Sequence, residues 1–227
     1  MAKDYITYNE HLNKELKTIG FVRKNMNQFV RKQDDVIQYL FLGHHTNGEH
    51  FVRYYDISVQ IAIPTIDVLE HEIGVTCGGF GCQIDYCNPE GSYDMYKWRI
   101  AKDDNPRIVQ QVVSDMLINI IQYAEPFFRQ HSTIKNILLA FERNKLSKMT
   151  RKRILPLLYI ANGQNEKALD FMDRTLHELS LYTEEEDMKL RKGYVLPGYK
   201  HTTPWVNRDY INYMDYVSKC KAYIDGL

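Results

Sequence analysis

The sequence predicts an α+β fold, in which helices cover one face of an antiparallel sheet of about five strands and a helical C-terminal subdomain follows. Three observations predict it. Residues 54–63 alternate between apolar and polar side chains, as a half-buried strand does. Similar short segments precede this strand with only tight turns between them, which excludes the long crossovers of parallel strands. From residue 132 onward, apolar residues recur only at helical spacing. The predicted domains are residues 1–131 and 132–227.

The strand at residues 54–63 defines the two faces of the sheet. Its apolar side chains point to one face and need a packed layer behind them. They are Tyr55, Ile57, Val59, Ile61 and Ile63. The intervening side chains of Asp56, Ser58 and Gln60 must therefore meet solvent, a ligand or a partner.

The residues before this strand predict one helix and three strands. Thr7 and Glu10 have the spacing of a capping box, and Gly20 supplies a C-terminal stop, so a short amphipathic helix is expected between them. Strands are expected at residues 21–24, 28–32 and 35–44.

A covering helix is expected from Pro106, because asparagine at position 105 is a preferred cap and proline suits the first helical turn. Its apolar stripe is two residues wide and consists of Ile108, Val109, Val112, Val113, Met116, Leu117, Ile120, Ile121 and Ala124. Between the main strand and this helix, residues 65–73 predict a short helix. A further strand is expected around Trp98.

The helical C-terminal part contains a hairpin around residues 161–164 that resembles a tetratricopeptide-type repeat. Because several repeats are needed to bury a solenoid core, a single hairpin is expected to dock on the rest of the protein. The expected helices span residues 133–143, 150–160 and 166–179, with a last one that starts at Asn207. The apolar face of the last helix comprises Tyr210, Tyr213, Met214, Val217, Cys220 and Ile224.

The composition limits the function classes. Lys and Arg total 29 and Asp and Glu total 29, so no global field favours nucleic acid or an anionic membrane. No segment approaches the roughly 20 apolar residues of a membrane helix and the start has no signal-peptide core, so a cytoplasmic protein is expected. Tyrosine is abundant, with 17 residues against 9 phenylalanines. That excess suits either a thinly covered sheet or a contact surface.

The N-terminal part combines a helix that ends in Gly20-Phe21, a basic hairpin with Arg23-Lys24 and Gln28-Phe29-Val30-Arg31-Lys32, and the strand start Asp35-Val36-Ile37-Gln38. With these motifs, the first 130 residues or so resemble a bacterial family known as domain of unknown function four-three-zero-four. The strand that ends at Pro64 and the segment Tyr96-Lys97-Trp98-Arg99-Ile100 fit the same pattern. The resemblance implies an α+β domain and no reaction.

Three cysteines, Cys77, Cys82 and Cys87, are spaced C-x4-C-x4-C, with His71 upstream. Zinc sites prefer ligand pairs two to four residues apart, so we expect no metal and no cofactor here, but half-buried free thiols. The alternative is a small hydrolase or metal-dependent enzyme that uses the Cys77–Cys87 loop with His71 or His44.

The glycines between Cys77 and Cys82 do not predict a phosphate-binding loop. Such a loop leads into a helix N-terminus, whereas residues 82–86 have a strand pattern. A bulge or tight turn is expected at residues 78–81.

A basic segment at residues 143–153 offers a second alternative function, weak nucleic-acid binding. It carries Arg143, Lys145, Lys148, Arg151, Lys152 and Arg153 without an acid between them. We expect these charges to be solvated and nucleic acid not to be the partner, and no membrane contact is expected.

The connection from residue 191 to 206 is too long for an ordinary loop and is rich in aromatic residues. We expect it to form a protein-binding surface together with the polar strand face. Its candidate binding residues are Tyr194, Tyr199, His201 and Trp205. The predicted function is therefore a non-catalytic interaction protein of the immunity or accessory type.

Overall fold

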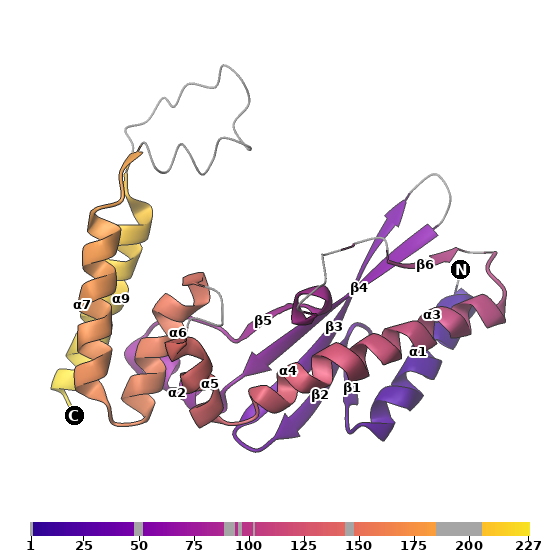
Figure 1. Cartoon of the computed structure of the whole chain (residues 1–227), viewed down its shortest axis with the longest axis horizontal. Coiled ribbons are helices and arrows are strands. Elements are labelled where there is room, and N and C mark those ends of the chain that lie inside the picture. Colours follow the sequence, from indigo (N-terminus) through magenta and orange to yellow (C-terminus); the bar gives the residue numbers. More distant parts are fainter. Residues whose placement is uncertain are drawn as a thin grey trace. The chain divides into compact units, whose positions relative to one another are not determined.

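The computed structural model describes residues 2–47, 52–88, 94, 97–101, 103–143, 148–184 and 206–227. The chain forms two compact units. The first comprises Met1–Asp67 and Gly78–Arg143, and the second comprises Val68–Cys77 and Asn144–Leu227. The division at residues 131 and 132 stays a prediction. The α+β class is confirmed: an antiparallel sheet combines with helices, and the C-terminal part is helical (Figure 1).

Helix α1 spans Ala2–Thr18 and therefore starts before the predicted capping box. The predicted start at Thr7 is wrong, because residues 2–6 contain no glycine or proline and continue the helix toward the N-terminus. The predicted stop is confirmed. Gly20 has a φ of 87°, and the amide of Phe21 bonds the carbonyl of Leu16 at 3.0 Å, which closes the helix end.

Six strands form the sheet of the first unit: β1 (Val22–Asn25), β2 (Gln28–Gln33), β3 (Val36–Asn47), β4 (Val52–Ala62), β5 (Phe80–Gln83) and β6 (Trp98–Ala101). Every pair is antiparallel, and the order is β1-β2-β3-β4-β5 with β6 also on β4. Strand β4 pairs with β3, β5 and β6. β3 pairs with its whole length, while β6 and β5 share its other edge at residues 52–55 and 58–61.

The alternation of β4 is confirmed. The five predicted core residues from Tyr55 to Ile63 are each at most 4% exposed, whereas Asp56, Ser58 and Gln60 are half-exposed. Among the described residues, one face of the sheet is therefore packed and the other is left uncovered.

The chain at residues 79–81, where β5 begins, lies so close to β4 that two glycines have no room for a side chain. A Cβ at Gly81 would collide with the carbonyl oxygen of Val59, and one at Gly79 with that of Ile61. The strand predicted for residues 82–86 is wrong beyond Gln83, because the chain turns into the 3₁₀ helix η1 (Ile84–Cys87). This turn brings the largely buried Asp85 carboxylate within 3.2 Å of the Lys97 ammonium.

The packed face is covered by α1 and by a continuous helical segment of α3 (Pro106–Asn119), the π-helical turn η2 (Ile120–Ala124) and α4 (Glu125–Gln130). α1 and α3 lie side by side (Figure 1). The Asn105 side chain caps α3 by accepting bonds from the amides of Arg107 and Ile108.

The predicted stripe of α3 is too wide. Val109, Val113, Met116, Ile120 and Ala124 are buried, but Ile108 is 37% and Ile121 55% exposed. A helix that rests on a sheet buries one side chain per turn fully, and its immediate neighbours lie about 100° away around the axis.

A partly buried ion pair joins the helices to the sheet. The Arg31 guanidinium on β2 lies 2.9 Å from the Glu125 carboxylate on α4 and donates to the carbonyl of Ile19 just beyond α1. It also donates to the fully buried Gln38 side chain on β3 and lies 4.4 Å from the ring centroid of Phe21. The ion pair, the hydrogen bonds and the ring contact together compensate for the water that the partly buried Arg31 guanidinium loses.

The remaining helices are α2 (Pro64–Ile73), α5 (Ile134–Glu142), α6 (Lys148–Ala161), α7 (Asn165–Ser180) and α9 (Arg208–Asp225). The predicted turn between α6 and α7 and the Asn207 cap of α9 are confirmed. On α9, Tyr216 is buried although the predicted face omitted it, and Met214 is 46% exposed although that face included it. No helix in the described part of the chain is long and apolar enough to cross a membrane.

Candidate functional site

The unpacked side of the sheet in the first unit is the best candidate for a functional surface; we call it the open face. Its strand residues alternate with the buried ones and lie opposite one another across the ladder. The register pairs Tyr39 with Gln60, Phe41 with Ser58, Gly43 with Asp56 and His45 with Tyr54. These side chains are half-buried, and α1, α3 and α4 lie on the opposite, packed side.

Aromatic rings form two stacked pairs on the open face. Tyr39 and Phe41 have ring centroids 5.7 Å apart, and His45 and Tyr54 have centroids 5.4 Å apart at an interplanar angle of 16°. The ammonium of Lys24 lies 5.9 Å from the ring centroid of Tyr39. Such pairs hold each ring in one orientation before any partner arrives, which lowers the entropic cost of binding.

The three predicted binding residues Asp56, Ser58 and Gln60 run along the middle of this face. Ser58 donates from its hydroxyl to the side-chain oxygen of Gln83 on β5 at 3.1 Å. The Asp56 carboxylate occupies the space that a Cβ at Gly43 would need. Their role in binding stays a prediction. The other four candidates, Tyr194, Tyr199, His201 and Trp205, lie outside the described residues.

Three cations border the open face. Lys24 on β1, Lys32 on β2 and Arg99 on β6 are exposed. The pairing of Lys32 with Ile37 and of Arg99 with Tyr54 places both on this side of the sheet. The described part of this face therefore carries more positive than negative charge, with Asp56 as a carboxylate among the aromatic pairs. These cations come from three separate strands, so no local pattern in the sequence indicates that they border one face.

The cysteines divide between the two units. Cys77, in the second unit, donates its thiol hydrogen to the carbonyl of Arg153 with a separation of 3.5 Å, and burial raises the pKa of this thiol. Cys82 and Cys87, in the first unit, have their sulfur atoms 3.5 Å apart. Within the described ranges, no group of three or more His, Cys, Asp or Glu side chains has a geometry that could hold a metal ion.

The histidines proposed for the enzyme alternative lie on different elements. His44 and His45 are adjacent on β3, so their side chains point to opposite faces of the sheet. His71 belongs to the second unit. Asp85 is only 8% exposed and is paired with Lys97 at 3.2 Å, as part of a polar network between η1, β6 and α3.

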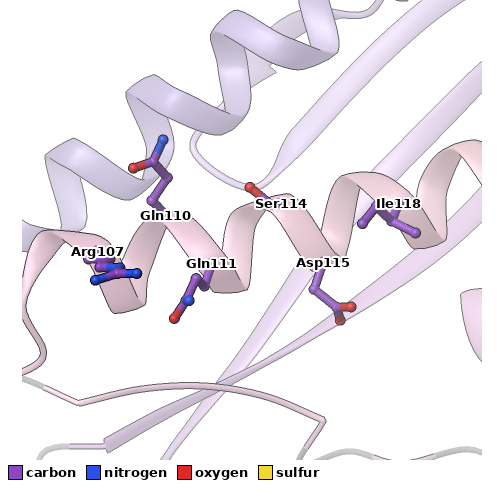
Figure 2. A pocket seen from close by; sticks show the side chains of 6 residues that line it. All are labelled: Arg107, Gln110, Gln111, Ser114, Asp115 and Ile118. Atoms are coloured by element: carbon purple, nitrogen blue, oxygen red, sulfur yellow. The ribbon is translucent and has the colours of Figure 1, made fainter.

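That network reaches the surface on α3. Lys97 also donates to the side-chain oxygen of Asn119 at 2.7 Å, and the Trp98 indole donates to the Asp115 carboxylate at 2.7 Å. Asp115 lines a shallow hollow of about 460 Å³, whose described lining side chains all come from α3 (Figure 2). They are Arg107, Gln110, Gln111, Ser114, Asp115 and Ile118. Because Asp115 already accepts two hydrogen bonds from its own unit, this hollow is a weaker candidate than the open face.

Three cations of the basic segment, Arg151, Lys152 and Arg153, make contacts within the second unit. Lys152 pairs with Asp209 at 3.2 Å, and Arg151 lies 5.2 Å from the ring centroid of Phe171. Arg153 donates to the carbonyl of Thr76. A hollow of about 350 Å³ lies beside them, and both Lys152 and Asp209 line it. Side chains held in internal contacts are poorly placed to neutralise successive phosphates.

Comparison with known proteins adds no relative. The chain matches no protein-family model, no curated protein and no solved structure. The resemblance of the first 130 residues to the family of unknown function therefore stays a prediction.

Proposed function

We propose that this chain is a non-catalytic interaction protein, of the immunity or accessory type, that binds a partner protein through the open face. One observation carries the proposal: two pre-stacked aromatic pairs, bordered by Lys24, Lys32 and Arg99, lie on the open face of the sheet. Aromatic side chains concentrate binding energy at protein interfaces, and rim charges select the partner.

The charges define the partner's chemistry. A complementary surface needs an apolar or aromatic centre to cover the rings and acidic side chains to meet the three cations. Asp56, Ser58 and Gln60 then require hydrogen-bond donors and acceptors from the partner or from bridging water. The partner is therefore an acidic protein surface with a small apolar core.

A single-stranded nucleic acid is less compatible with this face. Base-stacking platforms offer ring faces to successive bases, whereas here Tyr39 stacks on Phe41 and His45 on Tyr54. The Asp56 carboxylate among the aromatic pairs also repels phosphate. Both features favour a protein partner.

Site-specific photo-crosslinking in the native cell tests the proposal. A photoreactive phenylalanine analogue replaces Tyr54 on the open face or, as the control, the exposed Ile118 on α3. The expected result is one protein captured from position 54 and not from position 118. The captured protein is then purified, and its affinity is measured directly against the wild type.

Charge-reversed variants complete the test. Lys32→Glu and Arg99→Glu are expected to weaken binding of the purified partner at least about tenfold each, while Ile118→Ala leaves it unchanged. Equal affinity for all four proteins would contradict the proposal. Capture of RNA, DNA or a second copy of this chain at position 54 would also contradict it.

A further inference from the structure

Cys82 and Cys87 form a close thiol pair that the proposed function does not use. Cys82 lies on β5 opposite Val59, and Cys87 ends the 3₁₀ helix η1. The tight turn of η1 brings the second sulfur back toward the strand, so that the sulfur atoms lie 3.5 Å apart and share a hydrogen bond. A disulfide needs about 2.05 Å. The sulfurs are therefore about 1.5 Å from bonding distance.

Neither cysteine belongs to the buried core. Cys82 and Cys87 are half-buried, whereas Cys220 is fully buried. A small oxidant can thus reach the pair, whereas the core residues of the sheet stay buried. This combination of access and a neighbouring thiol is typical of oxidisable cysteines.

We propose that Cys82 and Cys87 are a peroxide-oxidisable dithiol, with Cys82 as the attacking residue and Cys87 as the resolving residue. The Cys82 thiolate attacks a hydroperoxide: an S–O bond forms, the O–O bond breaks, and the alkoxide or hydroxide leaves as the alcohol or water after taking a proton. The Cys87 sulfur then attacks the sulfenic acid. The S–S bond forms, the S–O bond breaks, and hydroxide takes the Cys87 proton and leaves as water. The two thiols lose two electrons, and the peroxide gains them.

The order of attack follows from the shared hydrogen bond. Either sulfur can donate the shared hydrogen; with Cys87 as the donor, the bond lowers the pKa of Cys82 more than burial raises it. The same bond raises the pKa of Cys87, and burial and the nearby Asp85 carboxylate add to the effect. Because the thiolate is the nucleophile, Cys82 reacts first.

The segment between Cys82 and Cys87 carries two contacts that formation of the disulfide would move. Gln83, next to Cys82, accepts the hydrogen bond from Ser58 on the open face. Asp85, between the two cysteines, holds Lys97. Drawing the sulfurs together moves the backbone that carries both contacts. The thiol chemistry itself does not depend on whether the open face binds a partner.

Peptide mapping of the full-length wild type tests the proposal. The protein is treated with hydrogen peroxide under native conditions, alkylated after unfolding, and digested with chymotrypsin, which cleaves after Phe80 and Tyr86 and so separates the two cysteines. The expected product is a disulfide between the peptides of Cys82 and Cys87, with Cys77 and Cys220 alkylated. Retention of all four free thiols, or a disulfide that involves Cys77 or Cys220, would overturn the proposal.

Two single variants test the order of attack. With dimedone present, Cys87→Ser is expected to accumulate labelled sulfenic acid on Cys82, because the resolving thiol is missing. Cys82→Ser is expected to leave Cys87 unlabelled. Labelling of Cys87 in Cys82→Ser together with an inert Cys82 in Cys87→Ser would reverse the assigned roles and overturn this part of the mechanism.

Discussion

The hydroxyl of Tyr213 on α9 replaces the hydrogen-bond donor that Pro156 removes from α6. Proline has no amide hydrogen, so Pro156 leaves the carbonyl of Lys152, four residues earlier, without its helical partner. Tyr213 donates to that carbonyl at 3.0 Å, and its side chain is fully buried. The proline within α6 is thus tolerated because a second helix completes its hydrogen bonding.

This relationship predicts a coupled pair of substitutions. Tyr213→Phe is expected to lower the free energy of unfolding by about 1–2 kcal/mol, because a buried carbonyl loses its donor. In a Pro156→Ala background the helix supplies its own amide, so the same substitution should cost clearly less. Chemical denaturation of the four proteins measures the coupling. Identical costs in both backgrounds would show that the hydroxyl does not compensate for the proline.

A second pair couples Gly43 and Asp56 on the open face. Gly43→Ala forces the Asp56 carboxylate out of its position, at a cost of about 1 kcal/mol for a poorer rotamer. In Asp56→Ala the obstacle is gone, and Gly43→Ala should stabilise the strand by about 0.5–1 kcal/mol. A double-mutant cycle from thermal or urea unfolding measures the difference. If the two substitutions change the free energy of unfolding additively, the Asp56 carboxylate does not occupy the space beside Gly43.

The two faces of β4 predict opposite tolerance of charge. Val59→Asp places a carboxylate without a partner in the packed face and is expected to cost several kcal/mol, enough to prevent stable folding. Gln60→Asp places the same group on the open face and should change the free energy of unfolding by less than about 1 kcal/mol. The yield of folded protein and the melting temperature distinguish the variants, and equal values would refute the assigned faces.

His131 predicts a loss of stability in mild acid. Its Nδ1 donates to the carbonyl of Phe127 at 2.8 Å, Nε2 is buried with no hydrogen-bond partner among the described residues, and its ring lies against Phe80. Burial lowers the pKa of His131 below its usual value, more than the bond to Phe127 raises it. The unfolded chain therefore takes up the proton more readily than the folded one. The neutral His131 side chain therefore contributes its full stabilisation above a pH of about 6.5, the pKa of histidine in the unfolded chain. As the pH falls below this value, the free energy of unfolding decreases by at most about 1.4 kcal/mol per pH unit.

The measurement is the free energy of unfolding between about pH 7.5 and 5, for wild type and His131→Asn. Asparagine keeps a donor for the Phe127 carbonyl but does not titrate. The variant is expected to be less stable at neutral pH and to lose less stability on acidification. Parallel curves for the two proteins would mean that His131 titrates equally in both states.

Local patterns in the sequence predicted much of the fold. The alternation of β4, the cap at Asn105 and the stop at Gly20 depend on neighbouring residues alone, and all three are confirmed. The predicted buried stripe of α3 is too wide, because the spacing of apolar residues does not show how much of the helix surface contacts the sheet. Ile121 is exposed for that reason.

The candidate site was less predictable, because it depends on strand register and on side chains that meet across the chain. Asp56, Ser58 and Gln60 follow from alternation, whereas the cations around them become neighbours only through pairing. The approach of Cys82 to Cys87 was missed because a strand pattern hid a 3₁₀ turn. Without that turn the spacing of the two cysteines shows only two thiols in one loop.

The π-helical turn η2 acts as a one-residue insertion that sets the rotational phase of α4. Each residue advances a helix by about 100°, so one extra residue in a turn rotates everything after it by that amount. Glu125 and Phe128 follow η2, and they meet Arg31 and the ring of Phe21. Deleting one residue between Ile120 and Ala124 would leave the composition of both helices intact and yet rotate the carboxylate away from its arginine. The number of residues in η2, more than their apolar content, therefore decides whether Glu125 can meet Arg31 and Phe128 can meet Phe21.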